Sequence, residues 1–224
     1  MASSCGKLAL IALGANLTSS AGRPDATLRA ALAEIAAGNG DIGGAGVRIK
    51  AVSRFWRTPA FPAGSGPDYV NACAALATTL DAPALLALLH RVEAALGRTR
   101  DGGRWAARGI DLDLLAMGAE VRPDAAGQAR WRDLPPDRQR VETPGELILT
   151  HPRLQDRAFV LAPLADIAPR WRHPLTGARV QEMLEALPPG ALAEAEKAKL
   201  PVLVVFGANW CGDCRMLDAT SKTG

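Results

Sequence analysis

The sequence is poor in aromatic residues and cysteine, and it has no long hydrophobic run. Aromatic side chains make up 4% of its 224 residues, which argues against a nucleic-acid surface built on stacked rings. No apolar stretch approaches the roughly 20 residues that a bilayer span requires, and the run over residues 8–13 ends at Gly14 without a signal-peptide cleavage pattern. Four cysteines are too few for a disulfide framework in a chain of this length. We therefore expect a cytoplasmic protein.

Lysine is also scarce, although the chain is not poor in positive charge. Only five of the 26 basic residues are lysines, the other 21 are arginines, and the formal net charge is +3. Hydrophobic residues at 48% and charged residues at 22% are ordinary for a globular protein. The length favours one domain with an extension, and the positions of the arginines should say more about function than their sum.

Hydrophobic periodicity predicts alternating strands and helices over the first half of the chain. Short apolar or alternating segments bounded by turn residues indicate strands, and Asp81 is a good N-cap for a helix with a broad apolar face. Strands are expected at residues 8–13, 47–56, 68–80 and 110–117, and helices at residues 24–37 and 82–96. This order predicts an α+β, ferredoxin-like βαββαβ sandwich, in which helices cover one face of an antiparallel sheet. The other face would be free for ligands.

The second half of the chain is less regular. Residues 122–145 are polar and show little periodicity, so we expect an inserted surface loop there. A short strand is expected at residues 147–150, and helices at 157–167 and 180–187. The prolines at 188 and 189 suggest a boundary. We expect a domain over residues 1–187, and a linker with a further fragment over residues 188–224.

Two aspartates on the last predicted strand form the strongest chemical signal. Asp111 and Asp113 would share one face with their Cα atoms roughly 6.6 Å apart, and carboxylates are the oxygen ligands that Mg²⁺ prefers. A bare Asp-x-Asp pair is more often a solvated strand face. Four arginines just before the aspartate pair favour a polyphosphate site instead. One guanidinium group can donate two parallel hydrogen bonds to a phosphate group. These arginines are Arg98, Arg100, Arg104 and Arg108.

Two further groups of side chains could bind a ligand. His151, Arg153 and Arg157 form a second basic group, which alone would most often be idle. Thr58-Pro59, Phe61, Tyr69 and Asn71 offer flat rings and an amide that could read a flat heteroaromatic molecule. Core packing of Tyr69 and surface polarity of Asn71 are the simpler interpretations.

Together these motifs resemble the 6-hydroxymethyl-7,8-dihydropterin pyrophosphokinases of folate biosynthesis. The similarity covers about residues 7–187, and its motifs follow one another in the family order. They are the segments 13–17, 57–59, 67–71, 97–100, 104–105, 108–114, 151–152 and 157–159. The resemblance implies a ferredoxin-like fold, ATP as co-substrate and two Mg²⁺ ions. It also implies transfer of an intact pyrophosphoryl group to the hydroxymethyl oxygen of the pterin, with release of AMP.

The resemblance also assigns roles to individual residues. Asp111 and Asp113 would bind the metal ions, with Arg98 as a transition-state contact and Arg108 as a second catalytic arginine. The ATP and catalytic-loop residues would be Glu93, Arg100, Trp105, Arg108, His151 and Arg157. Tyr69 and Phe159 would sandwich the pterin and Asn71 would read its edge, in a pocket lined by Thr58, Pro59 and Phe61. The expected partners are the two small-molecule substrates, with no nucleic acid and no membrane, and a monomer is expected.

The C-terminal segment has a different character. An apolar run over residues 201–206 leads to Cys211 and Cys214 in a Cys-x-x-Cys arrangement, which resembles the active-site segment of thioredoxin-like proteins. Only residues 215–224 follow, whereas such a domain needs on the order of a hundred residues. We expect an incomplete fragment. Two alternative functions stay open at this point: a thiol oxidoreductase using these cysteines, and a ferredoxin-like RNA-binding module.

Overall fold

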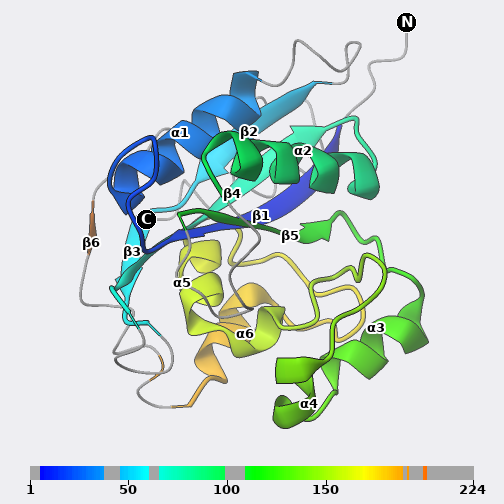
Figure 1. Ribbon diagram of the computed structural model, residues 1–224. Coiled ribbons are helices and arrows are strands. Elements are labelled where there is room, and N and C mark those ends of the chain that lie inside the picture. Colours follow the sequence, from blue (N-terminus) through cyan, green and yellow to red (C-terminus); the bar gives the residue numbers. More distant parts are fainter. Residues whose placement is uncertain are drawn as a thin grey trace, which may run out of the picture.

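The computed structural model describes residues 6–37, 46–60, 66–98, 109–188, 191 and 199–200, and an antiparallel sheet lies at its centre (Figure 1). The strand order is β5-β1-β4-β3-β6, and β2 also pairs with β4. The strands are β1 (Lys7–Ala15), β2 (Val47–Val52), β3 (Phe55–Thr58), β4 (Tyr69–Thr78), β5 (Asp111–Met117) and β6 (Lys199–Leu200). Every pairing among them is antiparallel. The predicted α+β, ferredoxin-like architecture is confirmed.

The first face of the sheet is covered by α1 (Pro24–Ala37) and α2 (Ala82–Ala95). Leu28 and Ile35 of α1 and Leu85 and Leu89 of α2 are fully buried in the same core cluster as Leu13 of β1. The α2 helix begins as predicted, because the Asp81 carboxylate accepts a hydrogen bond from the Ala84 amide at 2.9 Å. Both predicted helices are confirmed.

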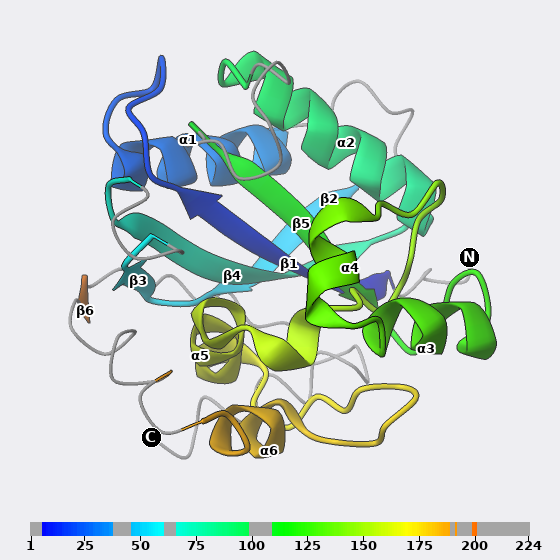
Figure 2. The same cartoon turned by 60° about the horizontal axis from the view of Figure 1, so that its bottom comes forward.

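The second face is also covered, by α5 (Ala158–Ile167) and α6 (Val180–Glu185), as Figure 2 shows. The prediction of a face left free for ligands is therefore wrong over most of the sheet. The physical reason is that the strands place apolar side chains on this face too, among them Leu10, Cys73 and Leu115, which pack against Leu161 and Leu164. Asn71, Asp111 and Asp113 bring polar groups to one end of this face, where β1 ends and β4 and β5 begin.

Residues 47–56, predicted as one strand, form parts of two strands. The break falls at Ser53 and Arg54, between β2 and β3, and both strands pair with β4. Ser53 Oγ donates to the Arg54 carbonyl and accepts from the Cys73 amide, while the Arg54 amide donates to Asp166. The Ser53 amide still donates to the Cys73 carbonyl at 2.9 Å, but the Cys73 amide is taken by the Ser53 hydroxyl and the Arg54 amide by Asp166, which explains the interruption.

The predicted surface loop at residues 122–145 contains two helices, α3 (Ala125–Arg132) and α4 (Pro136–Val141), so that prediction is wrong. The Asp124 carboxylate caps α3 by accepting from the Gly127 amide at 2.7 Å. Helices this short bury too few side chains to give a visible apolar period. The strand expected at residues 147–150 is a single bridge between Arg122 and Leu149. In the part of the chain that the structure describes, no helix has the length and hydropathy to cross a membrane.

Candidate active site

The site forms where β3, β4, β1 and β5 end side by side. Gly14 of β1 pairs with Asn71 of β4 on one side and with Asp111 of β5 on the other. A Cβ atom at Gly14 would lie 2.9 Å from Asn71 Oδ1, which is closer than real Cβ atoms approach. The strand register therefore places an amide and a carboxylate two strands apart, with a glycine between them.

The two aspartates share one face of β5, as predicted. Leu112 and Leu114 between and after them are buried in the core under α1 and α2, which directs Asp111 and Asp113 to the opposite face. Their side chains are 28% and 37% exposed. Two partly exposed carboxylates thus lie at the end of the sheet where β5 begins.

Glu93 of α2 lies against this strand. Its side chain is 1% exposed, and its Oε1 atom accepts a hydrogen bond from the Leu112 amide at 2.7 Å and pairs with Arg98. Arg98 Nη1 is also 2.9 Å from Asp111 Oδ1. Burial raises the pKa of Glu93, and the Leu112 N–H and the Arg98 charge oppose that rise. The predicted role of Glu93 is in ATP binding, whereas the contacts found here are with the strand and with Arg98.

His151 is held alongside β5 by its backbone amide, which donates to the Leu115 carbonyl at 2.8 Å. Desolvation lowers the pKa of His151 to about 3, and the charges of Arg157 and Arg153 act in the same direction. Its Nδ1 atom accepts from the Arg153 amide at 3.1 Å, so Nε2 carries the proton of the neutral ring. His151 is therefore a neutral donor near the Asp pair. Arg157 Nη1 lies 3.8 Å from Asp113 Oδ2.

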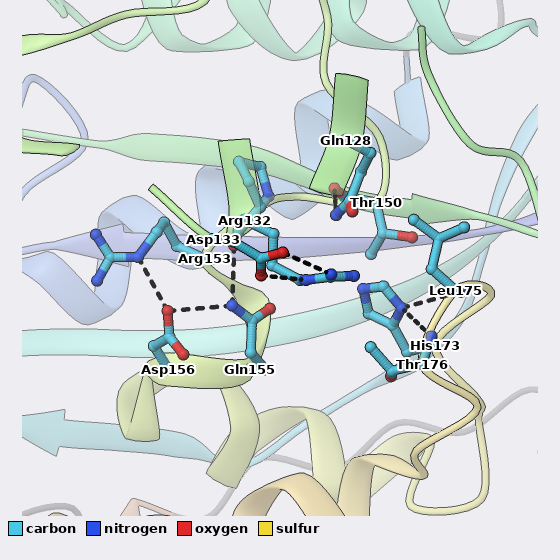
Figure 3. A network of polar contacts seen from close by, with 11 residues as sticks. Gln128, Arg132, Asp133, Thr150, Arg153, Gln155, Asp156, His173, Leu175 and Thr176 are labelled. Atoms are coloured by element: carbon cyan, nitrogen blue, oxygen red, sulfur yellow. Dashed lines mark hydrogen bonds and ion pairs between the residues drawn. The ribbon is translucent and has the colours of Figure 1, made fainter. Parts of the chain in front are cut away.

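The residue before His151 is hydrogen-bonded to α3, a contact that the sequence did not predict (Figure 3). The fully buried Gln128 donates from Nε2 to the Thr150 carbonyl at 3.1 Å, and Gln155 donates to the Pro152 carbonyl at 3.0 Å. One glutamine in a polar stretch carries no signal of burial, so only the structure could show this. The inserted helix thus supports Thr150, which precedes His151, while Gln155 supports Pro152, which follows it.

The predicted pterin-binding residues are only partly brought together. Asn71 and Thr58 are both buried, and Asn71 Nδ2 donates to Thr58 Oγ1 at 2.8 Å. Tyr69 pairs with Thr58 across the strands and is half-buried. Phe159, at the start of α5, is 40% exposed, and the Arg157 guanidinium lies 5.7 Å from its ring centre. Pro59 is exposed just after β3.

Several predicted residues lie outside the described residues, so the structure says nothing of their placement. These are Phe61, Arg100, Arg104, Trp105, Arg108, Cys211 and Cys214. The roles assigned to them stay predictions.

The two aspartates fit a metal ion that is bound partly by the protein and partly by a substrate. Among the residues that the structure describes, no group of three or more His, Cys, Asp or Glu side chains could hold a metal ion alone. Asp111 and Asp113 supply two carboxylates, and Mg²⁺ in phosphate-transfer sites is bound by one or two carboxylates together with substrate phosphates and water. The residues present therefore fit Mg²⁺ better than an ion that needs a complete protein cage.

Comparison with known proteins gives two family matches. Residues 10–169 match the family described as 7,8-dihydro-6-hydroxymethylpterin-pyrophosphokinase, and residues 184–221 match a family described as thioredoxin-like. A Synechocystis protein is 33% identical over 177 residues, which are 79% of this chain and 74% of that protein. A Bacillus subtilis protein is 31% identical over 175 residues, 78% of this chain and 86% of that protein. Both carry the name 2-amino-4-hydroxy-6-hydroxymethyldihydropteridine pyrophosphokinase.

Solved structures share the fold. A structure of HPPK-DHPS in complex with substrates has a TM-score of 0.56 at 12% identity, covering 82% of this chain and 43% of that one. The wild-type HPPK-DHPS of Plasmodium falciparum has a TM-score of 0.51 at 12% identity, covering 80% of this chain and 44% of that one. The chain thus spans less than half the length of these structures, and the likeness concerns the fold.

Proposed function

Because the chain belongs to the 7,8-dihydro-6-hydroxymethylpterin-pyrophosphokinase family, we propose that it transfers pyrophosphate from ATP to 6-hydroxymethyl-7,8-dihydropterin in folate biosynthesis. The products would be the pterin diphosphate and AMP. The observation that carries the proposal is the shared strand end at Gly14, where the register brings the Asp111 carboxylate and the Asn71 amide to either side of one residue. A nucleotide and a pterin can then bind as neighbours.

On the nucleotide side, Asp111 and Asp113 would hold Mg²⁺, and we propose two ions. Bound Mg²⁺ neutralises phosphate charge and orients the triphosphate for in-line attack. Arg157 and the neutral Nε2–H of His151 would contact phosphate oxygens without adding a proton-transfer step. Arg98 would stabilise charge in the transition state. By family resemblance, Arg100, Trp105 and Arg108 would complete the ATP site and catalytic loop, together with Glu93.

On the pterin side, Asn71 would read the polar edge of the heterocycle. Thr58 uses one amide N–H of Asn71, which orients the side chain and leaves its second N–H and its carbonyl for the ligand. Tyr69 and Phe159 would stack on the two faces of the pterin, and Pro59 and Phe61 would line the pocket. Catalysis would be positioning plus charge stabilisation, without a covalent enzyme intermediate.

We further propose that residues 1–187 form the catalytic domain, and that the protein acts as a cytoplasmic monomer without nucleic acid. Residues 188–224 would be an incomplete thioredoxin-like fragment. The thioredoxin-like match favours thiol chemistry of Cys211 and Cys214 as a second candidate activity, confined to the tail.

The proposal is tested by product analysis with the purified full chain. With ATP, Mg²⁺ and 6-hydroxymethyl-7,8-dihydropterin, AMP should form in step with a pterin diphosphate. The matched control is 6-methyl-7,8-dihydropterin, which lacks the accepting hydroxyl and should give no AMP. ADP as the main product, or AMP formation with the methyl compound, would contradict the proposal.

A further inference from the structure

Arg98 already neutralises one of the two aspartates in this structure. It follows α2, and its side chain is 20% exposed. Its guanidinium pairs with Glu93 and places Nη1 2.9 Å from Asp111 Oδ1. Asp111 therefore has a cationic partner supplied by the protein itself.

The pair formed by Arg98 and Glu93 is fixed by backbone hydrogen bonds at both residues. The Arg98 amide donates to the Glu93 carbonyl at 3.0 Å, and the Glu93 carboxylate is tied to the Leu112 amide at 2.7 Å. The Glu93 side chain is 1% exposed, so its charge is compensated by the Arg98 guanidinium and the Leu112 N–H rather than by water. Arg98 is thus held between α2 and β5 by its contacts with Glu93, and its position beside Asp111 is fixed by the fold.

The two aspartates differ in this respect. The nearest distance between Asp113 and Arg157 is 3.8 Å, compared with 2.9 Å between Asp111 and Arg98. Attraction between unit charges falls with distance and with exposure to water, so the Asp111 pair is the stronger of the two. A divalent cation arriving at this face meets one carboxylate that is engaged and one that is only loosely paired.

A guanidinium and a divalent cation compete for one carboxylate, because their positive charges repel each other when both lie against it. Binding of a metal ion by Asp111 therefore weakens its contact with Arg98. The released guanidinium would still be anchored through Glu93, beside the place where the phosphates of the nucleotide would bind.

We propose that Arg98 is a built-in competitor of the divalent cation for Asp111, which leaves this carboxylate when the metal ion binds and then serves the nucleotide phosphates. The inference rests on the proposed function, because it takes Asp111 as a metal ligand. It makes Arg98 a positioning residue in the metal-free protein as well as a phosphate contact later in the reaction.

The test measures metal binding by the full chain without nucleotide. Mn²⁺ is titrated into wild type, Arg98→Gln, Arg98→Lys and Arg153→Gln, and free Mn²⁺ is read by electron paramagnetic resonance. Arg153 pairs with Asp156 at 3.1 Å, so Arg153→Gln is a control that removes a nearby positive charge without touching either aspartate contact. Thermal unfolding confirms that each variant is folded.

Arg98→Gln should bind Mn²⁺ about five-fold more tightly than wild type, as expected for the loss of one competing ion pair of about this strength. Arg98→Lys should fall between the two, because lysine keeps the positive charge but lacks the rigid planar guanidinium that holds Nη1 against both carboxylates. Arg153→Gln should stay within about two-fold. The turnover of Arg98→Gln should fall although its affinity for Mn²⁺ rises. A merely structural role of Arg98 would not produce these two opposite changes.

Unchanged or weaker Mn²⁺ binding by Arg98→Gln would overturn the proposal, as would equal tightening in Arg153→Gln. Asp111→Asn separates this failure from a failure of the proposed function. If Asp111→Asn binds Mn²⁺ as well as wild type, the metal site itself is misplaced. If it binds more weakly while Arg98→Gln is unchanged, only the competition is excluded. Absence of Mn²⁺ binding at millimolar concentration in both wild type and Arg98→Gln would also overturn the proposal.

Discussion

The Glu93 carboxylate on α2 accepts a hydrogen bond at 2.7 Å from the backbone amide of Leu112, the residue between Asp111 and Asp113. A helix on one face of the sheet thereby fixes the strand segment that presents two carboxylates on the other face. Leu112 itself is buried among the apolar side chains between the sheet and the helices α1 and α2. The metal-binding geometry proposed here therefore depends on a residue that is itself shielded from solvent.

Replacing Glu93 should show this dependence. Glu93→Ala removes the acceptor for the Leu112 amide and the partner of Arg98, and it should lower the free energy of unfolding by about 1–3 kcal/mol. Glu93→Gln keeps a carbonyl acceptor and should lose less stability, while turnover falls in both. Chemical denaturation measures the effect, with Glu34→Ala on the exposed side of α1 as the control. Equal stability of Glu93→Ala and Glu34→Ala would contradict the role.

Asp111→Asn and Asp113→Asn should each lower turnover by several orders of magnitude at saturating Mg²⁺, because each loses a charged ligand of the metal ions. The fold should be intact, since both side chains are partly exposed and asparagine has nearly the same shape. Steady-state AMP release and circular dichroism are the measurements. Near-normal turnover in either variant would exclude that residue as a metal ligand.

Thr58 should affect recognition of the pterin without affecting ATP. Thr58→Val removes the hydroxyl that accepts from Asn71 Nδ2, and a lost hydrogen bond of about 1 kcal/mol corresponds to an increase of about five-fold in the KM for the pterin. Thr58→Ser keeps the hydroxyl and is the matched control. The account would be wrong if both variants raised the KM equally, or if the KM for ATP rose instead.

His173 should make the stability of the fold depend on pH. Its side chain is buried, and its Nδ1 atom accepts hydrogen bonds from the Leu175 and Thr176 amides at 3.2 and 3.3 Å (Figure 3). Burial lowers the pKa of His173 from its usual 6.5, and the charge of Arg132 adds to this. Below about pH 6.5 the unfolded chain gains a proton that the folded chain resists, so stability falls until the lower folded pKa is passed.

The comparison variant for this prediction is His173→Asn, which keeps an acceptor near the two amides but does not titrate in this range. The stability advantage of wild type over His173→Asn should shrink as the pH falls from about 7.5 to about 5. Urea unfolding at several pH values measures this difference. A difference that does not change with pH would show that the folded pKa of His173 is not lowered.

A chain that ends at Leu187 should retain AMP release within about two-fold, because all the residues proposed to act in the reaction lie at or before Phe159. Leu187 packs against the apolar cluster between the sheet and the helices α5 and α6, so the truncated chain keeps that cluster. The full chain should not reduce insulin efficiently, since residues 188–224 are far fewer than the roughly one hundred residues that a thioredoxin-like core needs. Loss of AMP release on truncation, or efficient insulin reduction, would show that the tail is functional.

The sequence predicted best where burial leaves a periodic pattern. The apolar run of β1, the leucines of α2 after Asp81 and the alternation of β5 all gave elements close to those observed. It predicted poorly where contacts between distant residues decide the structure. Arg54 meets Asp166 from α5 and interrupts an extended segment, and no local pattern could show that pairing.

The site divides in the same way. The shared face of Asp111 and Asp113 follows from strand geometry, so the sequence could give it. The contact of Arg98 with Asp111 and the support of Thr150 by Gln128 join side chains from different segments whose relative placement no local pattern shows, so they required coordinates. Family membership, rather than residue patterns alone, decides between a pterin enzyme and an RNA-binding module of similar fold.

Pyrophosphoryl transfer is tested most directly by following the β-phosphorus of ATP. The full chain is supplied with Mg²⁺, 6-hydroxymethyl-7,8-dihydropterin and ATP that carries a radiolabel on its β-phosphorus, and the products are separated. Transfer of an intact pyrophosphoryl group predicts that the label leaves with the pterin and that AMP is unlabelled. Label retained in ADP, with an unlabelled pterin monophosphate, would contradict the account.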